Sequence, residues 1–366
     1  MARRAEAARA KARASIAAVL RRSGVEAESA LQPLGERLRE HARVTLSFHP
    51  DRRLYDGLTI AEKLLREGRY RSQFETGVSS GSRTAFAGGD RDTWENHLFG
   101  GAYHEFGVRP DERPKYGALN VMDHADGGSP RFGSCYFVLR RHITPHCSFT
   151  WGDSHEGPEH VGTVEVLDAL LAALLETSET TGEALGTPGM DVGSLLRFAA
   201  SLERRAPSQR AVGRALDTYI EAQVHADVEL ACDAEALVID PAFEGTATGD
   251  RLHELCERNG IAIESHPGFA LDAVEIAARV PDDFRGPRMG PLASRVVRCF
   301  GAGGGTLDAV VIGRAADSLH HEPDVWQDWG TPEETLQHLK KLWHVLVRYG
   351  RARSERPKGA DHLSVR

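Results

Sequence analysis

Between residues 44 and 230 the sequence repeatedly places short β-prone segments between irregular, glycine-rich connections. These segments are rich in β-branched and aromatic residues or alternate between apolar and polar residues, as strands do. Helical patterns lie mostly before and after them, so the chain does not show the regular alternation that βαβ units require. The pattern therefore predicts an α+β fold. The expected strands are residues 44–49, 116–122, 133–140, 147–151 and 219–230.

Helices are expected at both ends of the chain and beside the strands. The last one has a strong start signal, because Thr331, Pro332 and Glu334 form a capping box with proline in the first turn. The expected organisation is a helical segment at 1–43, a main domain at 44–350 with a mixed C-terminal part, and a flexible tail at 351–366. The expected helices are two within 1–43, then 59–67, a turn at 92–99, 164–175, 191–203 and the one that begins at Thr331.

Composition argues against several classes of protein. The net charge of −8 and the pI near 6.1 are unlike those of a general nucleic-acid binder. No apolar run approaches the roughly 20 residues that span a bilayer. The five cysteines show no CxxC spacing, which fits a reduced cytosolic protein. The first 23 residues are basic and lack the apolar core of a signal peptide, so they are either a solvated helix or a delivery or membrane-surface segment.

The segment 219–225 (YIEAQVH) carries the most informative polar pattern. Residues two apart on a strand share a face, so Glu221, Gln223 and His225 point the same way while the apolar residues between them point the other way. This face is either an exposed sheet surface or the wall of a cleft that presents a carboxylate, an amide and an imidazole to a ligand.

Three further segments can contact a ligand. His49 and Arg52 follow a strand end, and the planar guanidinium matches phosphate oxygens, although a structural ion pair would explain the arginine equally well. Ser148 and Thr150 share one face of a strand and can hold a ribose or an amide. Residues 73–82 combine hydroxyls and glycines, as anion-binding loops and mobile loops both do.

The 17 histidines raise the alternative of a metal-dependent hydrolase. His142, His146, His155 and His160 are close in sequence. No HExxH or comparably tight spacing occurs, and metal sites usually show such ligand pairs. No metal site is therefore expected.

Seven sequence blocks together resemble a bacterial family, the CteC-type effectors, which are ADP-ribosyltransferases that modify a threonine of ubiquitin. The blocks cover about residues 44–245 in the order expected for that family. They are FHPDR (48–52), YRSQFETGVSSGS (70–82), GGDRDTWENHLFGGAY (88–103), RPKYGALN (113–120), PRFGSCYF (130–137), FTWGDSH (149–155) and YIEAQVH (219–225).

The resemblance implies an ADP-ribosyltransferase-like split β-sandwich, in which two small antiparallel sheets hold NAD in the cleft between them. It implies Glu221 as the catalytic carboxylate, NAD as a substrate, and a protein acceptor, with ubiquitin as the partner. It also implies synthesis in a bacterial cytoplasm with possible delivery into a host or rival cell. The residues expected to bind the NAD are Arg52, His49, Ser148, Thr150, Tyr116, Asn120, Gln223 and His225.

One departure from the family pattern keeps the assignment of the carboxylate open. Many members carry Gln/Glu-x-Glu with the second residue catalytic, whereas this chain has Glu221-x-Gln223. Glu229 and Glu244 are therefore alternatives to Glu221. Three other functions also remain open at this point: an NAD glycohydrolase of the same fold, a catalytically inactive binding module, and the metal-dependent hydrolase.

Overall fold

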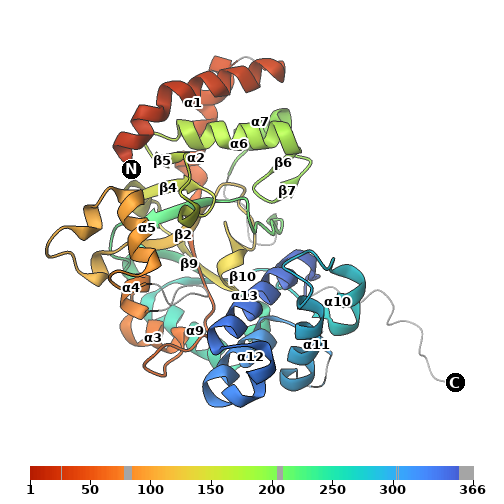
Figure 1. Ribbon diagram of the computed structural model, residues 1–366. Helices are drawn as coiled ribbons and strands as arrows, with labels where there is room; N and C mark the ends of the chain where they lie inside the picture. Colours follow the sequence, from red (N-terminus) through yellow and green to blue (C-terminus); the bar gives the residue numbers. More distant parts are fainter. Residues whose placement is uncertain (26, 78–84, 204–208, 302, 304, 354–366) are drawn as a thin grey trace.

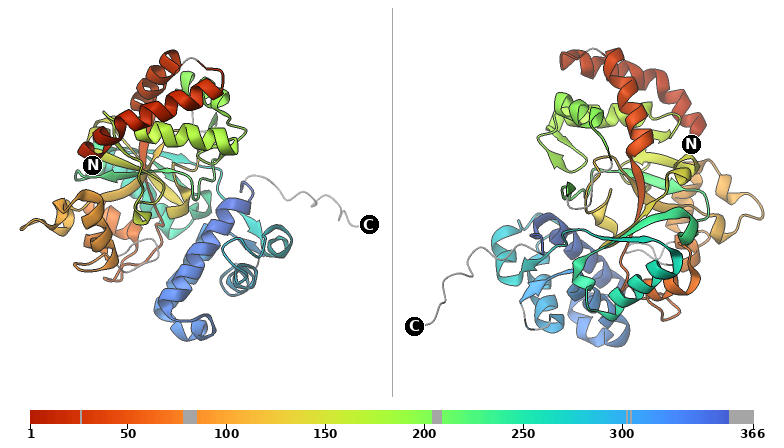
Figure 2. Two further views of the ribbon diagram at one scale, coloured as in Figure 1. Left: turned by 45° about the horizontal axis from the view of Figure 1, so that its top comes forward. Right: turned by 180° about the vertical axis from the view of Figure 1, so that it is seen from behind.

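The computed structural model describes residues 1–25, 27–77, 85–203, 209–301, 303 and 305–353 (Figure 1). An eight-stranded mixed sheet runs through the middle of the molecule. Two groups of helices lie at opposite ends of it, as the two further views also show (Figure 2). In spatial order the strands are β10 (Ala262–Ser265), β9 (Ala234–Ile239), β3 (Cys135–Leu139), β1 (Arg43–Phe48), β2 (Lys115–Asn120), β8 (Ile220–Val224), β4 (Cys147–Trp151) and β5 (Val161–Thr163).

The helices of the described residues are distributed over the whole chain, and two small strand pairs lie outside the main sheet. The helices are α1 (Ala2–Arg22), α2 (Ala27–His41), α3 (Ile60–Glu67), α4 (Gln73–Thr76), α5 (Asp90–Phe99), α6 (Asp168–Thr181), α7 (Val192–Ala200), α8 (Leu230–Asp233), α9 (Ala247–Asn259), α10 (Ala273–Arg279), α11 (Met289–Phe300), α12 (Ala309–His321) and α13 (Pro332–Tyr349). The pairs are β6 (Glu183–Ala184) with β7 (Thr187–Pro188), and β11 (Leu271–Asp272) with β12 (Thr306–Leu307).

The main sheet is joined in its middle by one short strand ladder, between β1 and β2. All of its pairings are antiparallel except that of β9 with β10. Strands β1 and β2 pair only through residues 43–45 and 118–120. Beyond that short ladder, β1 continues along β3 and β2 continues along β8, so the two halves of the sheet separate. Gly117 lies at the point of separation, where a Cβ atom would be 2.2 Å from the carbonyl oxygen of Thr45.

The N-terminal helix α1 is part of the main core. Its apolar face, which includes Ile16, Val19 and Leu20, is buried in the same hydrophobic cluster as the sheet and α6. Arg13 Nε contacts Asp168 Oδ1 of α6 at 2.7 Å, and Figure 1 shows the two helices side by side. Helix α1 is therefore packed on the sheet domain and is not a separate solvated helix.

The C-terminal helices α10 to α13 form a lobe that packs against the loop after β1. The Asp51 carboxylate lies against Gly313 of α12, where any side chain would collide with it. Arg53 Nε contacts Asp317 Oδ1 at 2.7 Å, and the His49 ring packs edge-on against Trp343 of α13 with centroids 5.1 Å apart. The loop that carries Arg52 is thus held between the sheet and this lobe.

The structure confirms the α+β fold and places a strand within or across each of the five predicted segments. The segment predicted at 219–230 is too long, because its strand β8 ends at Val224 and helix α8 begins at Leu230. The structure also confirms the capping box at Thr331. Two further expectations differ. One continuous sheet replaces the two separate sheets, because the short β1–β2 ladder joins the halves. The mixed region after residue 231 supplies two further strands, β9 and β10, to the same sheet. Half of the glycine–serine segment 73–82 (residues 78–82) and most of the tail 351–366 lie outside the described residues.

We predict that Gly117→Ala destabilises the protein by about 1–3 kcal/mol, the usual cost of forcing an extra carbon into a packed site. The added Cβ would push β2 away from the Thr45 carbonyl at the joint of the sheet. Gly290→Ala is the matched control, because a Cβ atom added at that position in α11 would meet no neighbouring heavy atom within 4 Å. Chemical unfolding of both variants measures the difference, and equal stability of the two would contradict the steric argument.

Candidate functional site

A cavity of about 340 Å³ opens where the two halves of the sheet separate. Ser47 and Phe48 of β1 and Tyr116 and Gly117 of β2 line it, all at or beyond the end of the β1–β2 ladder. The remaining walls come from the loop after β1, α3, the segment 69–71, α4, α5, the segments 129–132 and 153–155, β8 and α13. Its size is at the lower end of the range of small-molecule sites. The cavity therefore exists because β1 and β2 are hydrogen-bonded over only part of their length.

Glu221 of β8 lies in the wall of this cavity and is only 5% exposed. Burial raises the pKa of its carboxyl to about 7, and the negative charge of Asp153 contributes in the same direction. The Ser154 hydroxyl and the Gln223 amide oppose that shift. A carboxyl group with a pKa near 7 exchanges its proton readily at neutral pH, which suits a group with a chemical role.

The orientation of Glu221 is fixed by the next polar residue on the same strand. Gln223 Nε2 donates to Glu221 Oε1 at 3.0 Å and to Thr150 Oγ1 at 3.1 Å. The Thr150 hydroxyl in turn donates to the carbonyl oxygen of Gly152 at 3.2 Å. The amide of Gln223 is thus held with its nitrogen toward the carboxylate.

A second set of hydrogen bonds fixes the other end of the Gln223 amide. Ser148 Oγ donates to Gln223 Oε1 at 2.8 Å, so its oxygen must accept from His225 Nε2 at 2.9 Å. His225 Nδ1 then accepts from the Tyr103 hydroxyl at 2.5 Å. Burial lowers the pKa of His225 to about 4, so its ring is neutral at pH 7, as this direction of bonding requires. A chain of hydrogen bonds that all donate in one direction therefore runs from Tyr103 to the Glu221 carboxylate.

These contacts change the role of four residues that were expected to bind NAD. Ser148, Thr150, Gln223 and His225 do share one face with Glu221, as the alternation predicts. Ser148, Thr150 and Gln223 are almost fully buried, and none of the four lines the cavity. They lie behind Glu221 and orient it, so the structure does not place them against a ligand.

Arg52 and His49 do line the cavity. Within the part of the chain that the structure describes, no side chain forms a hydrogen bond or ion pair with the Arg52 guanidinium, and burial lowers its pKa. The charge of Asp51 opposes that shift, and the Arg52 side chain is half-buried, so a ligand anion can still compensate the guanidinium. The His49 ring lies 3.4 Å from the Ser134 hydroxyl, and burial together with the charges of Arg52 and Lys340 lowers its pKa to about 3.

An aromatic wall faces these groups. Tyr116 and Trp94 both line the cavity, and their rings are 5.5 Å apart. The Arg91 guanidinium lies 4.8 Å from the centroid of each ring. The Tyr116 hydroxyl donates to Glu95 Oε1 at 2.8 Å, and Arg113 donates to the other oxygen of the same carboxylate at 2.9 Å. This hydrogen bond and this ion pair connect α5 to β2 and to the residues just before it.

Asn120 does not belong to the site. Its amide donates to the carbonyl oxygen of His124 at 3.0 Å and accepts from the backbone N–H of the same residue at 2.9 Å. Both ends of the side chain are thus used to close the turn after β2, and Asn120 does not line the cavity. Phe149, which follows Ser148 on β4 and so points to the opposite face of the sheet, is fully buried in the core.

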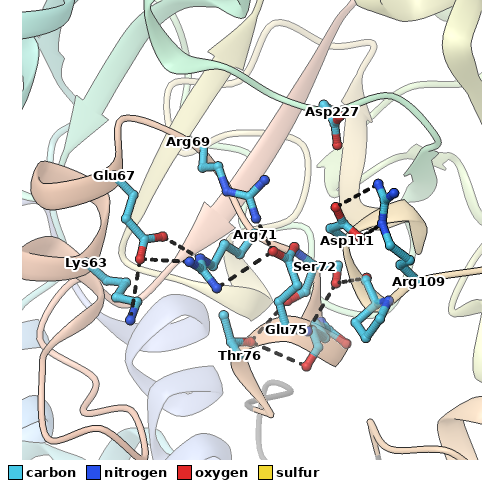
Figure 3. A network of polar contacts seen from close by, with 12 residues as sticks. Lys63, Glu67, Arg69, Arg71, Ser72, Glu75, Thr76, Arg109, Asp111 and Asp227 are labelled. Atoms are coloured by element: carbon cyan, nitrogen blue, oxygen red, sulfur yellow. Dashed lines mark hydrogen bonds and ion pairs between the residues drawn. The ribbon is translucent and has the colours of Figure 1, made fainter.

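The charged residues on the outer wall are mostly paired with one another. Figure 3 shows Lys63, Glu67, Arg71, Glu75 and Arg69 in a row of ion pairs of alternating sign along the segment that includes α3 and α4. This wall is therefore electrostatically compensated, in contrast to Arg52.

Sequence reasoning missed several residues that the structure brings to the cavity. Ser129 is 1% exposed and lines the cavity, and its hydroxyl has no hydrogen-bond partner among the described residues. Lys340 reaches it from α13. No local pattern distinguishes either residue. Of the alternative carboxylates, Glu229 and Glu244 are both exposed and lie outside the cavity wall.

The described residues contain no group of three or more His, Cys, Asp or Glu side chains that could hold a metal ion. Among those residues no helix is long and apolar enough to cross a membrane. Residues 43–349 match the model of a family described as a protein of unknown function (DUF3626), a range that begins at β1 and ends at α13. No curated protein matches the chain.

The raised pKa of Glu221 predicts a specific dependence of stability on pH. Between its ordinary pKa of 4.5 and its folded value of about 7, the folded protein holds a proton that the unfolded chain releases. Stability from this group therefore falls as pH rises through that window. Glu221→Gln removes the effect, so we expect it to stabilise the protein by about 1–3 kcal/mol at about pH 8 and to change little at about pH 4.

The matched control is Glu244→Gln, which changes an exposed carboxylate. Comparison of variants with the parent is needed because burial also raises the pKa of Asp51 to about 7 and adds its own dependence on pH. Denaturant unfolding at the two pH values gives the difference. Destabilisation by Glu221→Gln at about pH 8 would show that burial of the ionised carboxylate does not weaken the fold.

Proposed function

The chain belongs to the DUF3626 family, and we propose that it is an ADP-ribosyltransferase that cleaves NAD and transfers the ADP-ribose to a protein. The observation that carries the proposal is that one cavity is lined by a buried carboxylate, Glu221, and by the Arg52 guanidinium, which forms no side-chain hydrogen bond or ion pair with any described residue. The cavity lies between separating halves of a sheet, which is where the seven-block resemblance leads us to expect NAD. An ADP-ribosyltransferase-like split of the sheet is part of this proposal.

The residues present suit the chemical parts of NAD. Arg52 offers a charge-assisted contact to a phosphate oxygen. The unpartnered Ser129 hydroxyl can bond a ribose or amide group. The rings of Tyr116 and Trp94 can stack on a planar base. Glu221 supplies a carboxylate whose position is fixed from behind by a chain of hydrogen bonds.

In the proposed reaction the bond between the ribose C1′ and the nicotinamide nitrogen breaks, and its electron pair leaves with nicotinamide. The ionised carboxylate of Glu221 stabilises the positive charge that develops on the ribose. The acceptor oxygen then bonds to C1′ from a protein hydroxyl, whose proton passes to Glu221 or to water. His225 is a poor alternative base, because both of its ring nitrogens are engaged and it does not line the cavity.

We predict that Glu221→Gln lowers the rate of NAD cleavage by about 10²–10³-fold while leaving NAD affinity nearly unchanged. The amide keeps the shape and the contact with Gln223 but lacks the charge that the transition state needs. Release of nicotinamide, measured in the presence of a metal chelator, gives the rate, and calorimetry gives the affinity. In the parent protein the rate should also rise with pH through about 7, as Glu221 loses its proton.

Glu229→Gln and Glu244→Gln are the controls, since both carboxylates are exposed and outside the cavity. Near-normal activity of Glu221→Gln, with loss in either control, would assign the chemistry to a different carboxylate. Activity that disappears with the chelator and returns with zinc would replace the proposal with a metal-dependent reaction.

The acceptor we propose is a threonine of ubiquitin, and the support for it is the sequence resemblance alone. Intact mass spectrometry of ubiquitin after incubation with the protein and NAD tests it directly. We expect an increase equal to one ADP-ribose, absent with the Glu221→Gln variant. Free ADP-ribose with no modified protein would instead identify an NAD glycohydrolase, and labelling of another protein in a lysate would replace ubiquitin as the acceptor.

A further inference from the structure

A second cation without a partner faces the cavity from the C-terminal lobe. Lys340 of α13 lines the same cavity as Arg52, and no hydrogen bond or ion pair links its ammonium group to any described residue. Gln337 lies three residues earlier, hence on the same face of the helix, and also lines the cavity. The helix α13 therefore forms one wall and presents a charged group to the interior.

The position of Lys340 relative to Arg52 is fixed by rigid contacts. Trp343 is 1% exposed, and its Nε1 donates to the carbonyl oxygen of Pro130 at 2.7 Å. The same indole packs against the ring of His49, three residues before Arg52. Both cations are thus anchored to one cluster of buried rings, although they are separated by 288 positions in the sequence (340 − 52).

The surroundings of Lys340 carry an excess of positive charge. Burial lowers the pKa of its ammonium group to about 8. The charges of Arg131, Arg52 and Arg285 act in the same direction, whereas the charge of Asp153 opposes them. The Asp153 carboxylate also lies 3.7 Å from Arg131, so it is shared between cations. Arg52 and Lys340 are half-buried like charges that line one cavity, and an anion of two or more charges would relieve their repulsion.

We propose that Lys340 and Arg52 together form a subsite for the diphosphate group of a nucleotide, so that the C-terminal lobe supplies half of the anion-binding site. The proposal rests on the proposed function for the nucleotide to which the diphosphate belongs. The anion site itself follows from two cations that line one cavity and form no ion pair with any described residue. The paired cations of the outer wall, such as Arg71 and Lys63, do not form part of it.

The test is calorimetric titration of the full chain with inorganic pyrophosphate, ADP and adenosine. We expect Lys340→Met to weaken the binding of pyrophosphate and ADP by about 10-fold or more, the effect of losing one charge-assisted contact, and to leave any binding of adenosine unchanged. Lys340→Arg should restore most of the affinity. Lys341→Met is the matched control, because Lys341 is exposed on the same helix and outside the cavity wall.

A measurement on the unaltered protein covers the case in which Lys340→Met fails to fold. Pyrophosphate should slow the acetylation of Lys340 by a small amine-reactive reagent and should leave the acetylation of Lys341 unchanged. Peptide mass spectrometry measures the acetylation of both lysines. Equal pyrophosphate affinity of the parent and Lys340→Met, or no protection of Lys340, would overturn the subsite. Tight, Lys340-dependent binding of ADP without any NAD cleavage would keep the subsite and refute the proposed function, so the two failures are distinguishable.

Discussion

The three residue pairs between β1 and β2 determine the form of the rest of the molecule. A longer ladder would close the sheet and eliminate the cavity, and a missing one would leave two unconnected halves. Gly117 permits the close approach at the joint, because its lack of a side chain lets β2 pass the Thr45 carbonyl. The backbone beyond the joint is turned toward a space that the C-terminal lobe and the segment with α3 and α4 enclose. Helices far from the sheet centre thus matter because they wall a gap that the sheet creates.

The sequence predicted the elements better than their assembly. Alternation and β-branched composition identify β1 and β8, and capping chemistry identifies the start of α13, because these signals are local. The continuous sheet was not predictable, since the pairing of β1 with both β2 and β3 is set by contacts between distant segments. The strands β9 and β10 were missed for a related reason. They form the single parallel pair of the described sheet, and their connecting helix α9 gives the region a mixed pattern.

The candidate site was likewise predicted from the sequence only in part. The alternation in residues 219–225 predicts which side chains share a face with Glu221, and that face is confirmed. The alternation does not predict which of these side chains reach the cavity, because the exposure of a side chain on a sheet face depends on the elements that cover that face. Ser148 and Gln223 are covered and orient Glu221, whereas Asn120 closes a turn. Lys340 has no sequence signal at all, since a lysine on an amphipathic helix is ordinarily a solvent-facing residue.

The position of α13 after the strands of the main sheet in the sequence has a consequence for synthesis. The ribosome synthesises β1, β2 and β8 before residues 332–349, and domains begin to fold as they emerge from it. A nascent chain can therefore hold Glu221 on its strand while the wall that carries Gln337 and Lys340 does not yet exist. The same is true of any product of premature termination before α13. The order of translation itself keeps incomplete copies of this protein from presenting a finished cavity inside the cell that makes them.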